Sequence, residues 1–457
     1  MSALWCERVL VDGILEHGVR FGIDAGLISS RESGVAARDG DDRAGFVVPG
    51  FANAHSHLFH RLLRGRTHDD GGDFWAWRER MYETAASLDP DSYRDLAIAV
   101  FAEMLAAGYT AVGEFHYLHH QPDGLPYDEH AMELALADAA ATVGIRLTLL
   151  DTCYLAGGIG QPQNTRQQRF GDGDAAGWLA RWHSLRERLA ERANPLVTLG
   201  AAIHSVRAVP PTAIAEIIAG LPADVPLHLH LSEQPRENED SLAVYGLTPT
   251  ALIASLGVLG ERLSVVHATH LTDDDIRLLG DAGVSVVMCP STEADLGDGI
   301  GPARSLADAG ASIALGSDQN AVIDPLLEIR GLEAGERLAS GERGRFSPAK
   351  LMHAATSAGY RSLGLGCARL ATGDPFDAVE LDLGSERTLG IFPEQVGLVA
   401  TASDVSAVWV GGRRAASRES GGIVTITNIG SVKQLMREVL KNESTTTNVV
   451  ETSAPDA

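Results

Sequence analysis

The chain has 457 residues, 45% hydrophobic and 21% charged, with a formal net charge of −24. This composition is too apolar for a disordered chain, and the length suits one large domain with a smaller one. The negative charge argues against a nucleic-acid partner, and without an apolar run of about 18 residues we expect no membrane segment.

Two separate parts of the chain carry short strand-like pieces bounded by Gly and Asp turns. They are residues 1–48, with "WCERVLVDG", and residues 365–430, with "VSAVWVGGRR". Such pieces are typical of a small β domain. We expect the two parts to form one discontinuous β-sandwich. The last segment, 431–457, is expected to be a short helix followed by a disordered tail, since its final part is polar.

Between these parts, residues 49–364 alternate β-like runs with helix-like stretches. The eight β-like runs are "FVVPGFANAH", "TAVGEFHY", "IRLTLLD", "VTLGAAIH", "VPLHLHL", "LSVVHATH", "VSVVMCP" and "SIALGSD". One helix is predicted from Asp89 or Asp91, as its N-cap, to Gly108, and another ends at Gly144. The sequence therefore predicts an α/β fold, a (β/α)₈ TIM barrel joined to the β-sandwich.

Titratable side chains stand at the ends of most of these runs, where a barrel of this kind carries its active site. They are His55, His57, His116, Tyr117, His204, His230, Glu233, His267 and Asp318. A single strand histidine is more often an ordinary core residue, but burying so many polar groups together needs compensation. Imidazoles with a carboxylate favour Zn²⁺ or Fe²⁺. His228 shares a strand face with His230 one layer deeper, so we expect it to pack or support.

The motifs "PGFANAHSH", "HLHLSEQ", "VVHATHL" and "LGSDQN", with the C-terminal "GCARLATGDPFDAVELD", resemble the amidohydrolase superfamily. The resemblance implies that the metal ligands are His55, His57, His230 and Asp318. Two-metal members commonly use a lysine on the fourth strand, and this chain has none before Lys350, which implies one divalent metal, Zn²⁺ or Fe²⁺. Members with His-x-x-Glu after the fifth strand are typically deaminases.

This resemblance also implies a mechanism. The metal lowers the pKa of bound water to about 7, Asp318 takes its proton, and His267 orients the resulting nucleophile. Glu233 then carries a proton to the leaving ammonia. We therefore expect Glu233, His267 and Asp318 to be catalytic in a hydrolytic deamination.

Within the superfamily, "FWAWRERMY", "EFHYLHH" and "HSVRAV" are similar to the deiminases that convert N-formimino-L-glutamate to N-formyl-L-glutamate and ammonia in histidine degradation. The resemblance implies that the substrate carboxylates are held by Arg78, Tyr117, His204 and Arg207. A surface salt bridge is the alternative for either arginine. His60 stands where the family often has Gln, and we expect it to contact the substrate. His119 and His120 are expected to be loop or supporting residues.

Other readings remain open. The chain could be another deaminase of the superfamily, acting on guanine or a related heterocycle, although paired arginines favour an acid. A non-catalytic scaffold that kept the barrel would be expected to lack some metal ligands, and none is missing here. A substrate-binding regulator is a further alternative, but it would leave Glu233 and His267 without a role. Four scattered cysteines without a C-x-x-C pair favour a reducing cytoplasm. We expect a cytoplasmic homodimer, as is common for such barrels, with a small dicarboxylate substrate.

Overall fold

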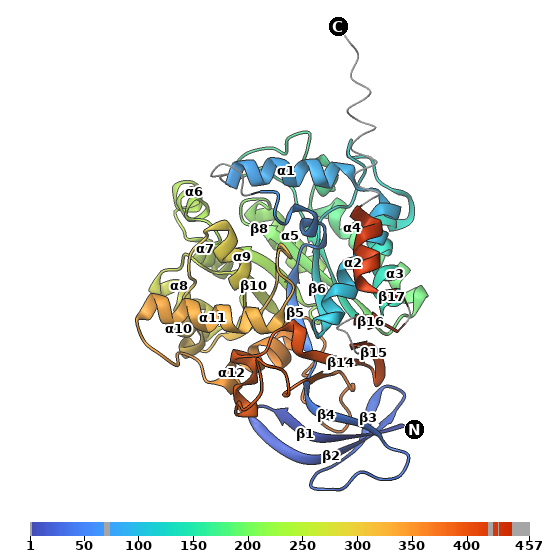
Figure 1. The fold of residues 1–457 in the computed structure, drawn as a ribbon. Helices are drawn as coiled ribbons and strands as arrows, with labels where there is room; N and C mark the ends of the chain where they lie inside the picture. Colours follow the sequence, from blue (N-terminus) through green and yellow to red (C-terminus); the bar gives the residue numbers. More distant parts are fainter. Residues whose placement is uncertain (1, 68–73, 419–423, 428, 441–457) are drawn as a thin grey trace.

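The structure is a computed structural model that describes residues 2–67, 74–418, 424–427 and 429–440 (Figure 1). Residues 432–440 of the predicted C-terminal segment are helical, and the tail predicted to be disordered, residues 442–457, lies outside the described part. Among the helices described, none combines the length and the apolar character needed to cross a membrane.

The larger part of the fold is a parallel barrel, as predicted. Its eight strands follow each other in chain order: β5 (Phe51–Ser56), β6 (Tyr109–His116), β7 (Arg146–Cys153), β8 (Val197–Ser205), β9 (Leu227–Leu231), β10 (Leu263–His267), β11 (Ser285–Met288) and β12 (Ser312–Leu315). Each corresponds to one predicted run. The chain after β12 closes the barrel on β5, because the backbone N–H of His57 donates to the carbonyl of Asp318 at 2.8 Å and that of Asp318 to the carbonyl of His55 at 3.0 Å.

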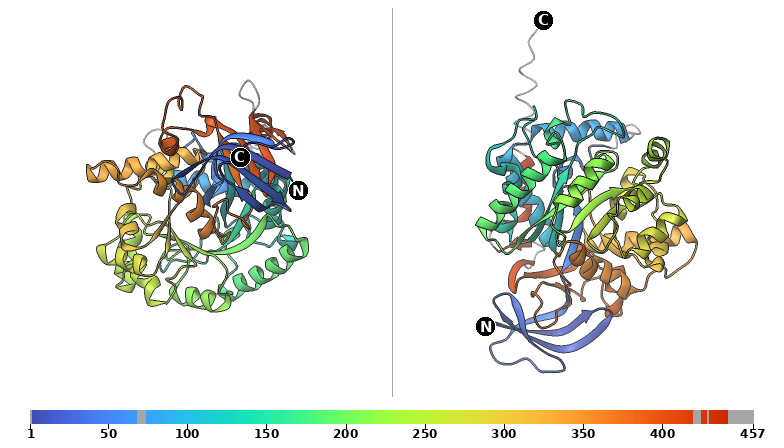
Figure 2. Two further views of the ribbon diagram at one scale, coloured as in Figure 1. Left: turned by 90° about the horizontal axis from the view of Figure 1, so that it is seen from below. Right: turned by 180° about the vertical axis from the view of Figure 1, so that it is seen from behind.

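Helices surround the barrel on its outside (Figures 1 and 2). They are α1 (Phe74–Ser87), α2 (Pro90–Ala106), α3 (Ala131–Val143), α4 (Ala175–Arg192), α5 (Pro211–Gly220), α6 (Pro235–Tyr245), α7 (Pro249–Ser255), α8 (Asp273–Asp281), α9 (Pro290–Leu296), α10 (Ala303–Ala309), α11 (Pro325–Ser340), α12 (Pro348–His353) and α13 (Gly359–Ser362). Leu227, Leu229 and Leu231 of β9 are fully buried, since a parallel strand is covered on both faces.

The ends of the two predicted helices follow from local chemistry. Asp89 is the N-cap of α2, and its carboxylate accepts a hydrogen bond from the backbone N–H of Ser92 at 2.8 Å. Gly108 follows the helix with φ 103°. Gly144 is the C-cap of α3 with φ 85°, a left-handed conformation that glycine adopts without steric cost.

The two ends of the chain build a separate nine-stranded mixed sheet. Its strands are β1 (Ser2–Val11), β2 (Ile14–Asp24), β3 (Leu27–Glu32), β4 (Asp42–Pro49), β13 (Ala378–Leu381), β14 (Val405–Val410), β15 (Arg413–Arg418), β16 (Val424–Ile426) and β17 (Gly430–Ser431). β4 of the N-terminal part pairs with β13 of the C-terminal part. Phe21, Phe376 and Trp409 share a core of their own there, and Figure 1 shows this region below the barrel.

One predicted strand is two strands in the structure. The run 46–55 ends β4 at Pro49 in the terminal sheet and begins β5 at Phe51 in the barrel. Gly50 lies between them, where a Cβ atom would stand 2.0 Å from Oγ1 of Thr110. Proline and glycine change the chain direction here. One continuous apolar run in the sequence therefore belongs to two different sheets.

Candidate active site and metal centre

A cavity of about 570 Å³ opens at the carboxyl ends of the barrel strands. Its volume lies within the roughly 300–1,000 Å³ typical of small-molecule sites. Its lining includes these predicted site residues: His57, His60, Arg78, Tyr117, His204, Arg207, His230, Glu233, His267 and Asp318. His55 lies directly beneath and is fully buried. The closed barrel thus brings together side chains that are up to 263 positions apart.

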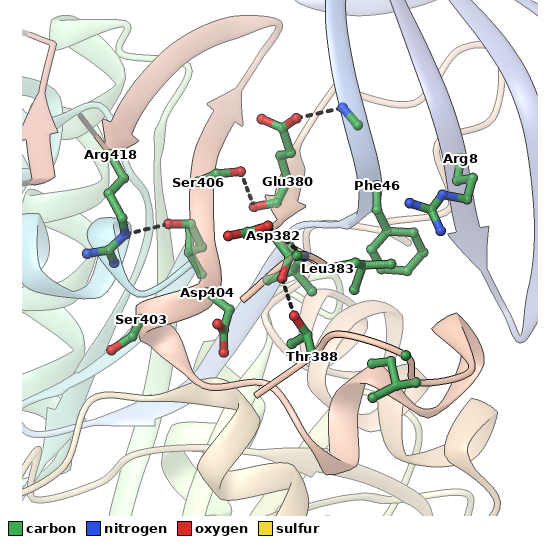
Figure 3. Close-up of a pocket in the computed structure, with 16 residues that line it drawn as sticks. Arg8, Phe46, Glu380, Asp382, Leu383, Thr388, Ser403, Asp404, Ser406 and Arg418 are labelled. Carbon is green, nitrogen blue, oxygen red and sulfur yellow. Dashed lines mark hydrogen bonds between the residues drawn. The ribbon is translucent and has the colours of Figure 1, made fainter. Parts of the chain in front are cut away.

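A larger cavity of about 740 Å³ lies at the terminal sheet (Figure 3). Its described lining contains no histidine or cysteine. Two of the polar groups there are engaged with the protein itself: Glu380 accepts from the backbone N–H of Gly45 at 2.6 Å, and Arg418 donates to the carbonyl of Val405 at 2.9 Å. The predicted site residues lie at the barrel cavity, so we place the candidate site there although that cavity is smaller.

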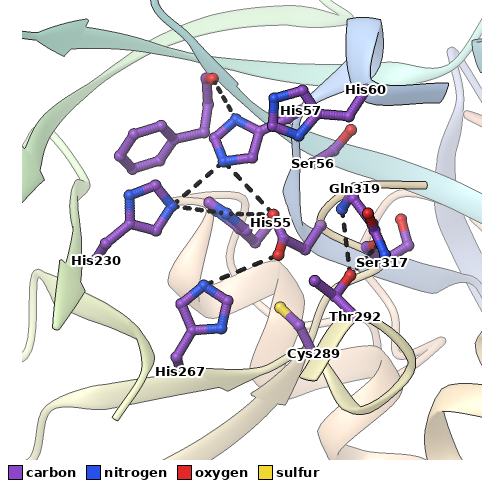
Figure 4. A network of polar contacts seen from close by, with 12 residues as sticks. His55, Ser56, His57, His60, His230, His267, Cys289, Thr292, Ser317 and Gln319 are labelled. Carbon is purple, nitrogen blue, oxygen red and sulfur yellow. Dashed lines mark hydrogen bonds and ion pairs between the residues drawn. The ribbon is translucent and has the colours of Figure 1, made fainter. Parts of the chain in front are cut away.

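Four ligand atoms converge at the barrel mouth (Figure 4). Nε2 of His230 lies 3.1 Å from Nε2 of His55 and 3.3 Å from Nε2 of His57. Oδ1 of Asp318 lies 3.3 Å from His55 Nε2 and 3.5 Å from His57 Nε2. Donor atoms about 2.1 Å from an ion at tetrahedral corners are separated by about 3.4 Å. The spacing fits one divalent metal ion among these four side chains.

The tautomers of two of these histidines support the same conclusion. Nδ1–H of His57 donates to the carbonyl of Phe115 at 3.0 Å, and Nδ1–H of His230 donates to the carbonyl of His204 at 2.9 Å. Each Nε2 therefore presents a lone pair. Burial lowers the pKa of His57 to about 3 and that of His55 and His230 well below the usual value. Neutral imidazoles whose lone pairs face one another fit a cation.

The backbone is strained at the strand ends that hold the site. Ser232, His267 and Asp318 have φ values of 49°, 69° and 44°, a left-handed region that residues with a Cβ rarely adopt. Such strain costs of order 1–3 kcal/mol per residue and concentrates at functional sites. Here it turns His267 and Asp318 toward the same ligand cluster.

His267 stands between two carboxylates. Its Nε2 lies 3.8 Å from Oδ2 of Asp318, and its Nδ1 lies 3.5 Å from Oε1 of Glu293. Glu293 is itself held by the backbone N–H of Cys289 at 2.9 Å. Glu293 therefore orients the imidazole from behind. The sequence reasoning missed this residue, and its only signal was a carboxylate in the first turn of α9, just after β11.

The predicted carboxylate-binding groups line the cavity, but not all face it as open donors. Arg207 donates from Nη2 to Oε2 of the predicted catalytic Glu233 at 2.6 Å and also lies 3.5 Å from Glu237. Arg207 therefore does form a salt bridge, which was the alternative to substrate binding, but this salt bridge lies within the cavity and not at the surface. Nε of Arg78 donates to the hydroxyl of Tyr82 at 2.7 Å. Glu237 is a second residue that the sequence reasoning missed.

His60, Tyr117 and His204 form an aromatic wall of the cavity. Nε2 of His60 lies 3.0 Å from the hydroxyl of Tyr117, and the His60 ring packs edge-on against Trp77 with centroids 5.2 Å apart. The rings of Tyr117 and His204 are also edge-on, at 5.7 Å. These side chains offer hydrogen bonds to a polar ligand around a flat, partly apolar surface.

Three other histidines lie away from the ligand cluster. His119 contacts Glu133 from Nδ1 at 2.8 Å, and His120 contacts Asp172 from Nε2 at 3.0 Å; both carboxylates also bind Arg181. Nε2 of the deeper His228 donates to the carbonyl of Ser362 at 2.9 Å. These histidines hold together the barrel wall and floor.

Comparisons with known proteins agree with this site. The model of the amidohydrolase family matches residues 46–415. The chain is 37% identical over 395 residues to formimidoylglutamate deiminase of Pseudomonas aeruginosa, covering 84% of this chain and 86% of that protein. It is 30% identical over 378 residues to 8-oxoguanine deaminase of the same species, covering 80% and 81%.

Solved structures show the same architecture. An amidohydrolase from Brucella melitensis superposes with a TM-score of 0.87 at 32% identity, covering 97% of this chain and 99% of that one. An adenosine deaminase from Xanthomonas campestris, whose crystal contains zinc, superposes with a TM-score of 0.80 at 23% identity, covering 98% of both chains. The second likeness concerns the fold alone.

An eight-stranded parallel barrel with three imidazoles and a carboxylate gathered at its mouth is the architecture of a metal-dependent hydrolase. The chain belongs to the amidohydrolase family.

Proposed function

We propose that this protein hydrolyses N-formimino-L-glutamate to N-formyl-L-glutamate and ammonia, with one Zn²⁺ held by His55, His57, His230 and Asp318. The observation that carries the proposal is the joining, in one cavity, of this ligand cluster with Glu233, His267 and two arginines. The similarity to a formimidoylglutamate deiminase over most of both chains supports the same substrate. We further propose a homodimer that works in the cytoplasm, which sedimentation and fractionation can check.

The residues of the chain supply the proton transfers. A bound Zn²⁺ would lower the pKa of a coordinated water to about 7. Asp318 accepts a proton from the attacking water. His267, whose Nε2 lies 3.8 Å from Oδ2 of Asp318, orients that water for attack. Glu233 carries protons to the formimino nitrogen. The water oxygen bonds to the formimino carbon, the bond from that carbon to the leaving nitrogen breaks, and both water protons end on the ammonia.

We assign the two substrate carboxylates to the part of the cavity that Arg78 and Arg207 line. Arg78 and Arg207 provide the positive charge that a dicarboxylate needs inside a chain of net charge −24. Planar guanidinium groups match carboxylates in two-pronged hydrogen bonds. Tyr117, just after β6, and His204 of β8 add donors, and His60 reaches the cavity beside Tyr117.

A deaminase acting on guanine or a related heterocycle is the second candidate. Its support is the aromatic wall of His60, Tyr117 and His204, which could face a flat ring, and the relative that is named an 8-oxoguanine deaminase. Two arginines in one cavity weigh against it, because planar guanidinium groups match carboxylates, which a neutral heterocycle lacks.

The deciding experiment measures ammonia release by purified protein of known metal content. N-formimino-L-glutamate, N-formiminoglycine and guanine are offered in parallel. We expect rapid release from the glutamate compound, slow release from the glycine compound, and about one zinc ion per chain, the count expected for a four-ligand site. Ammonia release from guanine alone would contradict the assignment of the arginines to substrate carboxylates but would still support the proposed metal centre.

A further inference from the structure

Arg207 lies between two carboxylates inside the cavity. Nη2 donates to Glu233 at 2.6 Å, and Nε lies 3.5 Å from Oε2 of Glu237. The side chains of Arg207 and Glu233 are 25% and 15% exposed, whereas that of Glu237 is completely buried. The three residues come from three places: the turn after β8, the end of β9 and the first turn of α6.

Arg207 already has two carboxyl partners before any substrate arrives. One guanidinium faces two carboxylates, and a substrate carboxylate would be the third. The Nε of Arg207 has no hydrogen-bond partner among the described residues. Burial raises the pKa of Glu237, and Arg207 together with the backbone N–H groups of Ser232 and Glu233 act against that rise. A buried carboxylate in this position is costly unless it holds a cation. Arg207 is the cation that Glu237 contacts, so Glu237 helps to keep Arg207 in place.

The bond to Arg207 also restrains Glu233. Burial raises the pKa of Glu233, but Arg207 and His267 lower it by more, so the pKa lies below its usual value. A carboxylate held in this way is a poor proton acceptor, and its Oε2 is committed to Arg207. The proton transfer assigned to Glu233 requires this bond to break or weaken during the reaction.

We propose that Glu237 is a positioning residue that anchors Arg207 while a substrate carboxylate replaces Glu233 on the guanidinium, and that this exchange frees Glu233 to move the proton. The proposal rests on the proposed function. Glu233 is the partner that leaves, because it faces the reacting nitrogen and becomes neutral once it accepts a proton. The side chain of Glu237, by contrast, is completely buried. Substrate recognition and proton transfer are thereby coupled through one arginine.

The first test compares Glu237→Gln with Glu239→Gln, an exposed glutamate of the same helix. With N-formimino-L-glutamate, we expect Glu237→Gln to lower kcat at least about tenfold, because the buried charge that anchors Arg207 is lost. KM and zinc content should change far less, and Glu239→Gln should match the parent.

A second substrate separates this role from general damage. N-formimino-propylamine has no carboxylate to exchange, so the parent and Glu237→Gln should turn it over at the same low rate. An equal loss on both substrates, or a Glu237→Gln variant that behaves like Glu239→Gln, would overturn the proposal.

A third measurement does not depend on turnover. In a crystal structure of the zinc-loaded protein with glutarate, Arg207 should bind a glutarate carboxylate and Glu237, with Glu233 released. Glutarate that leaves the Arg207–Glu233 bond intact, or that does not bind, contradicts the exchange. Failure of the proposed function is a different result, namely no ammonia release from N-formimino-L-glutamate by the parent enzyme.

Discussion

The surroundings of each histidine decide its chemistry. His57 and His230 donate from Nδ1 to backbone carbonyls, which leaves a lone pair on Nε2 of each. His119 contacts Glu133 with one nitrogen and the carbonyl of Thr152 with the other, at 2.8 and 2.9 Å. Both of its nitrogens must donate, so His119 is an imidazolium with no lone pair for a metal. Residue type alone does not separate these cases.

The assigned role of Glu233 predicts a loss of turnover without a loss of metal. Glu233→Gln keeps the size of the side chain and its hydrogen bonding near Arg207 but cannot carry a proton. We expect kcat to fall by about 10²–10⁴, the usual contribution of a general acid–base group. Zinc content per chain, measured by atomic emission, should equal that of the parent. A variant that deaminates at the parental rate would show that another group moves the proton.

The assigned role of Arg78 predicts a defect in binding. Arg78→Met removes a charge that we assign to a substrate carboxylate and keeps an apolar stem. We expect KM to rise about 10- to 100-fold with little change in kcat, the scale of a hydrogen bond to a charged group. Arg94→Met, on the outer surface of α2, is the matched control. An unchanged KM would remove Arg78 from the substrate site.

At the scale of elements, the barrel strands end in positions that turn functional side chains into the cavity. β9 and β10 pair in register, with Val266 beside His230 and His267 beside Leu231. His267 reaches the cavity only because its backbone takes φ 69°. The alternation of a regular strand would point it elsewhere, so the strained strand end is part of the site.

The junction between β4 and β5 predicts a stability defect. Gly50→Ala would place a Cβ atom 2.0 Å from Oγ1 of Thr110 and 2.8 Å from its Cβ. The two sheets must then shift, which costs about 1–3 kcal/mol for overpacking. We expect a lower thermal midpoint and, because β5 carries His55 and His57, weaker zinc retention. Gly260→Ala, where nothing lies within 4 Å, should leave both properties unchanged.

At the scale of the whole molecule, closure of the barrel creates the proposed metal centre. The backbone pairing between His55, His57 and Asp318 joins the first and last barrel strands. The four ligands therefore come together only in the closed barrel. An ion that binds them stabilises the closed form by mass action.

Metal removal should consequently affect both stability and activity. Protein treated with a chelator should lose ammonia release and unfold at a lower temperature, because binding to the native state alone stabilises by about 4 kcal/mol when the free metal is 1,000 times its Kd. One equivalent of Zn²⁺ should restore both. A chelated protein with the parental melting temperature would mean that the four side chains do not hold the metal.

Much of this protein could be predicted from sequence because the physics involved is local. Apolar runs of strand length, an Asp cap and a Gly stop define the βα units, and the end of each run indicates which side chains reach the barrel mouth. His55, His57, His230 and Asp318 could be placed at the mouth in this way, and the resemblance of their motifs to the amidohydrolase superfamily supplied the roles that we propose for them. The break at Gly50 was missed because Val48, Pro49 and Phe51 read as one apolar run although they serve two sheets.

Only the tertiary structure decided how the charged groups are paired. The sequence showed that Arg207, Glu233 and Glu237 exist, but their partnership depends on β8, β9 and α6 meeting at one corner of the cavity. In the same way, Glu293 stands behind His267 only because β10 and β11 are neighbours. Strand periodicity can be recognised from a few neighbouring residues in the sequence. An ion pair instead depends on distances of a few ångströms between segments far apart in the chain, and only the closed barrel sets those distances.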